Sequence, residues 1–195
     1  MDVDDAEAVR TIFLIRHGEK PTEEPQREGV DQYGRQNEHS LIPQGWERAG
    51  ALATLFAPFV GSPRSGLLVP EQLVSPRYEN LKGTGLYRTH QTIEPIEARL
   101  GIPIETAYSE EQLPELVASL TAPPSGTTLV CWEHTQIIEI AHELPVSSGK
   151  VPPRWPSERF DMVFSFSRVS TSGPFAFQQI PQLLLARDSA VPFPT

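Results

Sequence analysis

The strongest indication of the fold class is the segment Ile12-Phe-Leu-Ile-Arg-His-Gly-Glu19. Its first four residues form a continuous apolar run that does not alternate with polar residues, which is typical of a buried strand in a parallel sheet. Gly18 and Pro21 end this run. The polar residues 21–40 have no periodicity and predict a long loop, and loops of this length in compact domains are usually functional or disordered.

Strand-like and helix-like segments alternate along the rest of the chain. Apolar residues at three- and four-residue spacing predict helices over residues 43–59, 89–100, 110–120 and 134–144. Short apolar runs predict strands over residues 11–15, 67–75, 103–107, 127–132, 160–167 and 175–184, with the last two paired as a hairpin. This alternation predicts an α/β fold, a three-layer α/β/α sandwich with a mostly parallel central sheet.

The domain organisation follows from length and composition. We expect an acidic tail over residues 1–10 and a single domain over residues 11–195. A chain of 195 residues buries enough surface to need no disulfide or metal staple. Its single cysteine, Cys131, excludes an internal disulfide framework and a cysteine-rich zinc site.

The charge balance limits the classes of partner. With 16 basic and 25 acidic residues the net charge is −9, which disfavours nucleic acid and anionic membranes. A local cluster of Arg and His can still bind an anion, because salt screens distant charges. The chain has no apolar run of membrane-spanning length, and its acidic N-terminus does not resemble a signal peptide. We therefore expect a cytoplasmic protein of unknown oligomeric state.

Two predicted strands end in a histidine. One runs into Arg16-His17 and the other into Glu133-His134, so in a parallel sheet both histidines project from one edge. Arg88 stands where a loop meets a predicted helix, and helix N-termini favour anions. The pattern indicates a site for an anionic ligand.

The sequence resembles the histidine phosphatase superfamily, whose members are phosphoglycerate-mutase-like. Residues 12–19 are similar to that family's signature strand and loop, and Leu41-Ile-Pro-Gln-Gly-Trp-Glu-Arg-Ala-Gly-Ala-Leu52 is similar to its helix start. Ser75-Pro76 followed by Arg88-Thr-His-Gln-Thr92 resembles a third motif, and Leu129–Ile138 places His134 where the family has its second histidine. The four pieces occur in the family's order over residues 11–144.

The resemblance implies catalysis through a phosphohistidine, without metal or cofactor. His17 would be the nucleophile, and Arg16 and Arg88 would hold the phosphoryl oxygens with their planar guanidinium forks. His134 would donate to the charge that builds up in the transition state. Lys20 would reach a second anionic group of the substrate, and His39, in the long loop, is a candidate substrate contact.

The resemblance leaves two positions open. The carboxyl group that protonates the leaving oxygen is Glu110, Glu111 or Glu133. The second phosphate-binding arginine is Arg88 or Arg77, and Thr89, Gln91 and Thr92 favour Arg88 because they complete the motif around it.

We therefore expect a metal-independent phosphomonoester hydrolase acting on a small phosphorylated metabolite. A phosphoglycerate-type mutase is an alternative, although Lys20-Pro21 stands where true mutases of the family carry a Trp-Asn pair. A degenerate member that binds a phosphorylated ligand, or that catalyses a non-hydrolytic reaction, is the other alternative.

Overall fold

The computed structural model describes residues 10–77, 87–122 and 126–195. Most of the expected acidic tail and most of the loop before Arg88 lie outside these residues. Arg10, which we assigned to the tail, is the buried first residue of the first strand.

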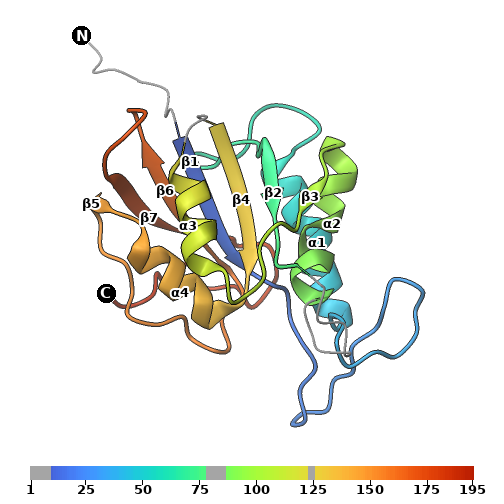
Figure 1. Ribbon diagram of the computed structural model, residues 1–195. Helices are drawn as coiled ribbons and strands as arrows, with labels where there is room; N and C mark the ends of the chain where they lie inside the picture. Colours follow the sequence, from blue (N-terminus) through green and yellow to red (C-terminus); the bar gives the residue numbers. More distant parts are fainter. Residues whose placement is uncertain (1–9, 78–86, 123–125) are drawn as a thin grey trace.

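Within the described residues, one seven-stranded sheet has the order β3-β2-β4-β1-β6-β7-β5 (Figure 1). The strands are β1 (Arg10–Arg16), β2 (Gln72–Val74), β3 (Ile104–Glu105), β4 (Gly126–Trp132), β5 (Val146–Ser148), β6 (Met162–Arg168) and β7 (Phe175–Pro181). β1 pairs in parallel with β4, β4 with β2, β2 with β3, and β5 with β7. β6 is antiparallel to both β1 and β7. The sheet is therefore mostly parallel, as predicted.

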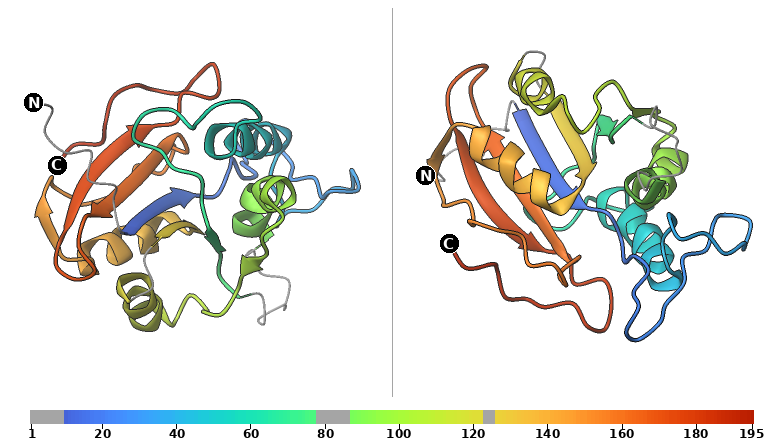
Figure 2. Two further views of the ribbon diagram at one scale, coloured as in Figure 1. Left: turned by 90° about the horizontal axis from the view of Figure 1, so that it is seen from above. Right: turned by 60° about the horizontal axis from the view of Figure 1, so that its bottom comes forward.

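In the part of the chain that the structure describes, four helices cover the two faces of this sheet. They are α1 (Pro43–Phe56), α2 (Tyr87–Leu100), α3 (Leu113–Thr121) and α4 (His134–Glu143). α1 and α2 pack together on one face, and α3 and α4 lie on the other (Figure 2). The expected three-layer α/β/α arrangement is confirmed.

The core divides between the two faces because successive strand residues point to opposite sides. Ile12 and Leu14 of β1 join the cluster under α3 and α4, whereas Phe13 and Ile15 join the cluster under α1 and α2. β1 therefore reads as an unbroken apolar run because both of its faces are covered.

Several element boundaries differ from the prediction. The strand expected over residues 67–75 is shortened to β2, which follows Pro70, a residue without an N–H to donate. The helix expected from Glu110 begins at Leu113, with Pro114 in its first turn, where proline is favoured. The segment expected as loop over residues 145–158 contains β5.

The long polar segment is a structured loop that is anchored to α1. Two isolated bridges, Thr22 with Arg27 and Val30 with Gln36, close short turns in it. The Trp46 indole Nε1 donates to the Val30 carbonyl at 2.7 Å. The segment extends away from the sheet and helices in Figure 1. None of the helices in the described residues is both long enough and apolar enough to cross a membrane.

Candidate active site

The parallel pairing of β1 and β4 brings the two histidine-bearing strand ends together. Arg16, the last residue of β1, lies opposite Trp132, the last residue of β4. His17 and His134 therefore follow neighbouring strands at one edge of the sheet, the place where ligands bind in open α/β sheets.

The Arg16 guanidinium is buried, and only one of its three nitrogens has a hydrogen-bond partner among the described residues. Its Nη1 donates to the carbonyls of Ser157 at 2.5 Å and Arg159 at 3.0 Å, and its Cζ lies 3.9 Å from the centre of the Phe160 ring. Its Nε and Nη2 are buried and have no hydrogen-bond partner among the described residues. Two buried, unsatisfied N–H groups cost about 1–3 kcal/mol each, so this edge of the guanidinium is prepared to bind an anion.

The His17 imidazole is held in one tautomer. The ring is 4% exposed, and Nδ1 lies 2.7 Å from the Gly18 carbonyl, which can only accept a hydrogen bond. The proton is therefore on Nδ1, and Nε2 keeps its lone pair. Burial lowers the pKa of His17 well below its usual value, and the nearby Arg16 lowers it further. His17 is thus a neutral imidazole with a free nitrogen.

We expect His17 to remain neutral well below pH 6.5, the ordinary histidine value. An NMR titration of the imidazole nitrogens measures this directly, and a His17 midpoint at or above 6.5 would contradict it. The unfolded chain protonates the His17 imidazole more readily than the folded chain does. Neutral His17 therefore contributes fully to the free energy of unfolding above pH 6.5, and this contribution is lost as pH falls through the folded-state pKa.

The loop that carries His17 is fixed by close contacts. The Gly18 N–H donates to Thr92 Oγ1 at 2.8 Å, and the same hydroxyl donates to the Arg88 carbonyl at 2.6 Å. A Cβ on Gly18 would lie 2.9 Å from the Gly45 carbonyl oxygen, so only glycine fits against the first turn of α1. The loop is therefore packed between α1 and α2.

Arg88 and Lys20 bring further positive charge to this edge. Arg88 Nη1 donates to the Glu38 carbonyl at 3.2 Å, while its Nε is buried without a partner among the described residues. Burial lowers the pKa of Arg88. Burial, then Arg16 and Arg88, lower the pKa of Lys20. Burial, with a smaller effect of Arg88, lowers the pKa of Arg16 to about 10, although nearby glutamates oppose the shift. The cations therefore crowd together, an arrangement that favours an anionic ligand.

The alternative arginine is engaged elsewhere. Arg77 donates to the carbonyls of Thr106 and Ala107, beside β3. Of the two candidates, the structure brings Arg88 to the cluster with Arg16. His39, by contrast, lies next to Glu38 and pairs with its carboxylate at 3.5 Å.

Glu133 is the N-cap of α4. Its carboxylate accepts from the Thr135 N–H at 2.7 Å, from the Thr135 hydroxyl and from the Gln136 N–H at 3.4 Å. Although burial opposes it, these bonds lower the pKa of Glu133. A second oxygen of Glu133 contacts His134 Nδ1. Glu133 is thus an ionised cap that partly balances the cations.

Burial lowers the pKa of His134, and Arg16 lowers it further, while Glu133 opposes both effects. Negative charge added nearby favours protonation of His134.

Glu110 differs from its neighbour Glu111. Glu110 is half-buried, and burial together with the charge on Glu133 raises its pKa, whereas Glu111 is exposed. The Glu110 carbonyl accepts from Gln136 Nε2 at 3.0 Å, which ties this segment to the first turn of α4. Glu110 and Glu111 both line a groove of about 830 Å³ between α3 and α4.

That groove does not fit a phosphate. Its other charged residues are also acidic, namely Glu139 and Glu143, and no Lys or Arg lines it. A phosphate dianion is repelled there and attracted to the Arg16 side of the strand ends. Among the described residues, no group of His, Cys, Asp and Glu has an arrangement that could hold a metal ion.

Sequence reasoning missed two features of this site. Phe160 forms a wall, with its ring centre 6.0 Å from that of His17 and its face under Arg16. Arg48 of α1 is 2% exposed and binds both Glu19 and Asp188. The only sequence signal for Arg48 is a charged residue within the otherwise apolar stripe of a helix.

The fold is similar to that of solved histidine phosphatases. No protein-family model matches the chain, and no curated protein matches it in sequence. The protein histidine phosphatase SixA, solved with tungstate, is 17% identical, with a TM-score of 0.55 over 88% of this chain and 97% of that one. A candidate alpha-ribazole-5'-P phosphatase from Escherichia coli is 12% identical, with a TM-score of 0.50 over 80% of this chain and 90% of that one. The chain therefore has the fold that the resemblance implies.

Proposed function

We propose that this chain, which has the histidine phosphatase fold, is a metal-independent phosphomonoester hydrolase that forms a phosphohistidine at His17. One observation supports this most directly. The buried, unpaired N–H groups of Arg16 adjoin a neutral imidazole whose Nε2 is free. Such a pair can bind a phosphoryl group and attack it without a metal ion.

The proposed reaction has two displacements. His17 Nε2 attacks phosphorus, the bond to the leaving oxygen breaks, and that oxygen takes a proton from Glu110. Water then attacks the phosphohistidine and gives its proton to Glu110, and inorganic phosphate leaves. Arg16 and Arg88 bind the phosphoryl oxygens throughout, and the dianion favours a protonated His134 that donates to them.

Glu110 is the best supported proton donor of the three candidates. Its raised pKa favours the protonated carboxyl that a general acid needs. Glu133 has a lowered pKa and is occupied as a helix cap, and Glu111 is exposed. The carboxylate of Glu133 also helps to keep Glu110 protonated, because like charges disfavour a second ionisation.

We expect Glu110→Gln to slow hydrolysis of an alkyl phosphate by about 10²–10⁴-fold, because an alkoxide leaves poorly without a proton. An aryl phosphate, whose leaving group needs little assistance, should lose far less activity. The measurement is kcat/KM for both substrates, with Glu111→Gln as the matched control. Equal losses on the two substrates, or a larger effect of the control, would exclude Glu110 as the acid.

We propose that the substrate is a small phosphorylated metabolite, with Lys20 and His39 as contacts beyond the phosphate. Lys20 directly precedes the long segment of residues 21–40 and His39 lies within it, and this segment borders the site through Glu38. We place the reaction in the cytoplasm, a reducing compartment in which the free, buried Cys131 persists. The negative net charge supports partners other than nucleic acid or an anionic membrane.

The experiment that tests this function is a phosphate-release screen over phosphorylated metabolites, run with and without a chelator. Release that persists with EDTA supports the proposal. No release from any compound by the folded protein, or release that EDTA abolishes, would reject it.

A further inference from the structure

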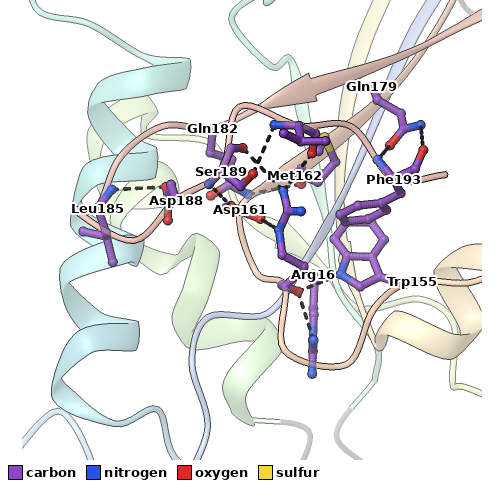
Figure 3. Close-up of polar contacts among 12 residues, drawn as sticks. Arg16, Trp155, Asp161, Met162, Gln179, Gln182, Leu185, Asp188, Ser189 and Phe193 are labelled. Carbon is purple, nitrogen blue, oxygen red and sulfur yellow. Dashed lines mark hydrogen bonds and ion pairs between the residues drawn. The ribbon is translucent and has the colours of Figure 1, made fainter.

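The segment of residues 182–193 follows β7 and contacts residues that support the candidate active site. Figure 3 shows Gln182, Asp188, Ser189 and Phe193 of this segment together with Asp161 and Trp155, and Trp155 lies next to Arg16. No helix or strand lies within this segment, so side-chain and backbone contacts with the rest of the protein hold it in place. Through Arg48 its contacts reach Glu19, which follows His17, and through Arg159 they reach Arg16, which precedes His17.

The first connection runs through Arg48. Arg48 Nη2 pairs with Glu19 at 2.8 Å and with Asp188 at 2.7 Å, and its Nε lies 3.1 Å from both Glu19 oxygens. The Asp188 and Arg48 side chains are each 3% exposed. Because Glu19 is two residues after His17, this buried contact fixes the far end of the nucleophile loop.

Asp188 is itself held in place by the segment. Its Oδ2 accepts from the N–H groups of Leu184 and Leu185 at 2.7 and 3.1 Å. Gln182, which is fully buried, accepts from Arg48 Nη1 at 2.9 Å and donates to the Met162 carbonyl at 3.2 Å. Arg48 therefore meets a preorganised acceptor set rather than one mobile carboxylate.

The second connection runs through Arg159. Asp161 accepts from Arg159 Nε at 2.6 Å and from the Ser189 N–H at 2.6 Å. Arg159 Nη2 also donates to the Val191 carbonyl at 3.2 Å. The side chain of Arg159 is thus tied to the segment, and the carbonyl of the same residue is one of the two that bind Arg16.

An aromatic contact supports the same carbonyl. Trp155 Nε1 donates to the Arg159 carbonyl at 2.7 Å, and the Trp155 ring lies 5.0 Å from that of Phe193. Gln179 bonds both the N–H and the carbonyl of Phe193, at 2.7 and 3.0 Å, and so fixes this ring.

We propose that Gln182–Phe193 is a positioning element of the active site, acting on His17 through Arg48 and on Arg16 through the Arg159 carbonyl. This inference rests on the proposed function and assigns Arg48, Asp188 and Phe193 as positioning residues. A buried ion pair adds little net stability, because desolvation offsets its attraction. Orientation of the reacting groups is the effect that such a network supplies, and a misplacement of about 1 Å can slow a reaction about a hundredfold.

Variants of the two connections should change different parameters, kcat for the Arg48 connection and ligand affinity for the Phe193 connection. Arg48→Lys keeps the charge but loses the planar fork, so kcat should fall on the order of tenfold or more while KM changes little. Phe193→Leu loosens the support of Arg16, so the Kd for tungstate or inorganic phosphate, and KM with it, should rise on the order of tenfold.

Matched controls lie at the opposite end of the sheet. Arg168→Lys changes another buried arginine, which donates to the carbonyls of Thr121 and Gly173, and Phe175→Leu changes a buried ring beside it. Both should lower Tm without changing kcat, KM or oxyanion affinity. If Arg48→Lys does not fold, Asp188→Asn tests the same connection.

The proposal is overturned if the wild type turns over substrate and the variants of Arg48, Asp188 and Phe193 show the kinetics and oxyanion affinity of their controls. A wild type without turnover is a different result, since it rejects the proposed function. In that case the oxyanion titration still decides whether Phe193 orients Arg16.

Discussion

His17→Ala is expected to abolish phosphate release, with a loss of at least about a thousandfold, the scale seen when a covalent nucleophile is removed. Alanine has no nitrogen to attack phosphorus, so the phosphohistidine cannot form at this position. The measurement is the rate of phosphate release under saturating substrate, beside the wild type.

Two controls separate chemistry from folding in that variant. His17→Ala should keep the near-UV circular dichroism of the wild type and should still bind tungstate, because Arg16 and Arg88 remain. His142→Ala, an exposed position on α4, is the matched control and should retain full activity. Retention of more than a few per cent of wild-type turnover would exclude His17 as the nucleophile.

Arg16→Lys is expected to lower kcat/KM by about 10²–10³-fold. The guanidinium binds two protein carbonyls with Nη1 and keeps Nε and Nη2 for the ligand. A lysine has one ammonium group, which cannot satisfy the carbonyls and present a parallel pair of N–H groups at once. Each charge-assisted hydrogen bond lost costs about 1.5–3 kcal/mol.

The matched comparison for Arg16→Lys is again Arg168→Lys. Arg168 is the buried last residue of β6 and lies opposite Arg10, at the end of β1 remote from Arg16. Its guanidinium also donates to two carbonyls. The control should keep wild-type kcat/KM despite a lower Tm. If both variants lose activity in proportion to stability, Arg16 is a structural arginine and not a phosphate ligand.

The sequence predicted the fold where local patterns agree with burial. The unbroken apolar run of β1 and the run of β4 are parallel neighbours, and their register places His17 and His134 after adjacent strand ends. Helical periodicity located α1, although the helix ends at Phe56 rather than Phe59. These features depend on short-range spacing, which a sequence displays directly.

The remaining parts of the site depend on contacts between distant segments. Arg48 and Asp188 are 140 positions apart, and Phe160 meets Arg16 from a loop that begins beyond β5. No spacing rule connects such residues. The choice among the three carboxyl candidates likewise depends on burial and neighbouring charge, which separate Glu110 from Glu133.

The most direct test of a phosphohistidine mechanism is to trap the intermediate. Rapid alkaline quenching during turnover, followed by mass spectrometry, should find one phosphoryl group, stable in base and labile in acid, on His17. The His17→Ala protein should carry none. The mechanism would be contradicted if the wild type turned over an aryl phosphate while no phosphoryl group could be found on His17, either in the wild type or in a Glu110→Gln variant whose intermediate should hydrolyse more slowly.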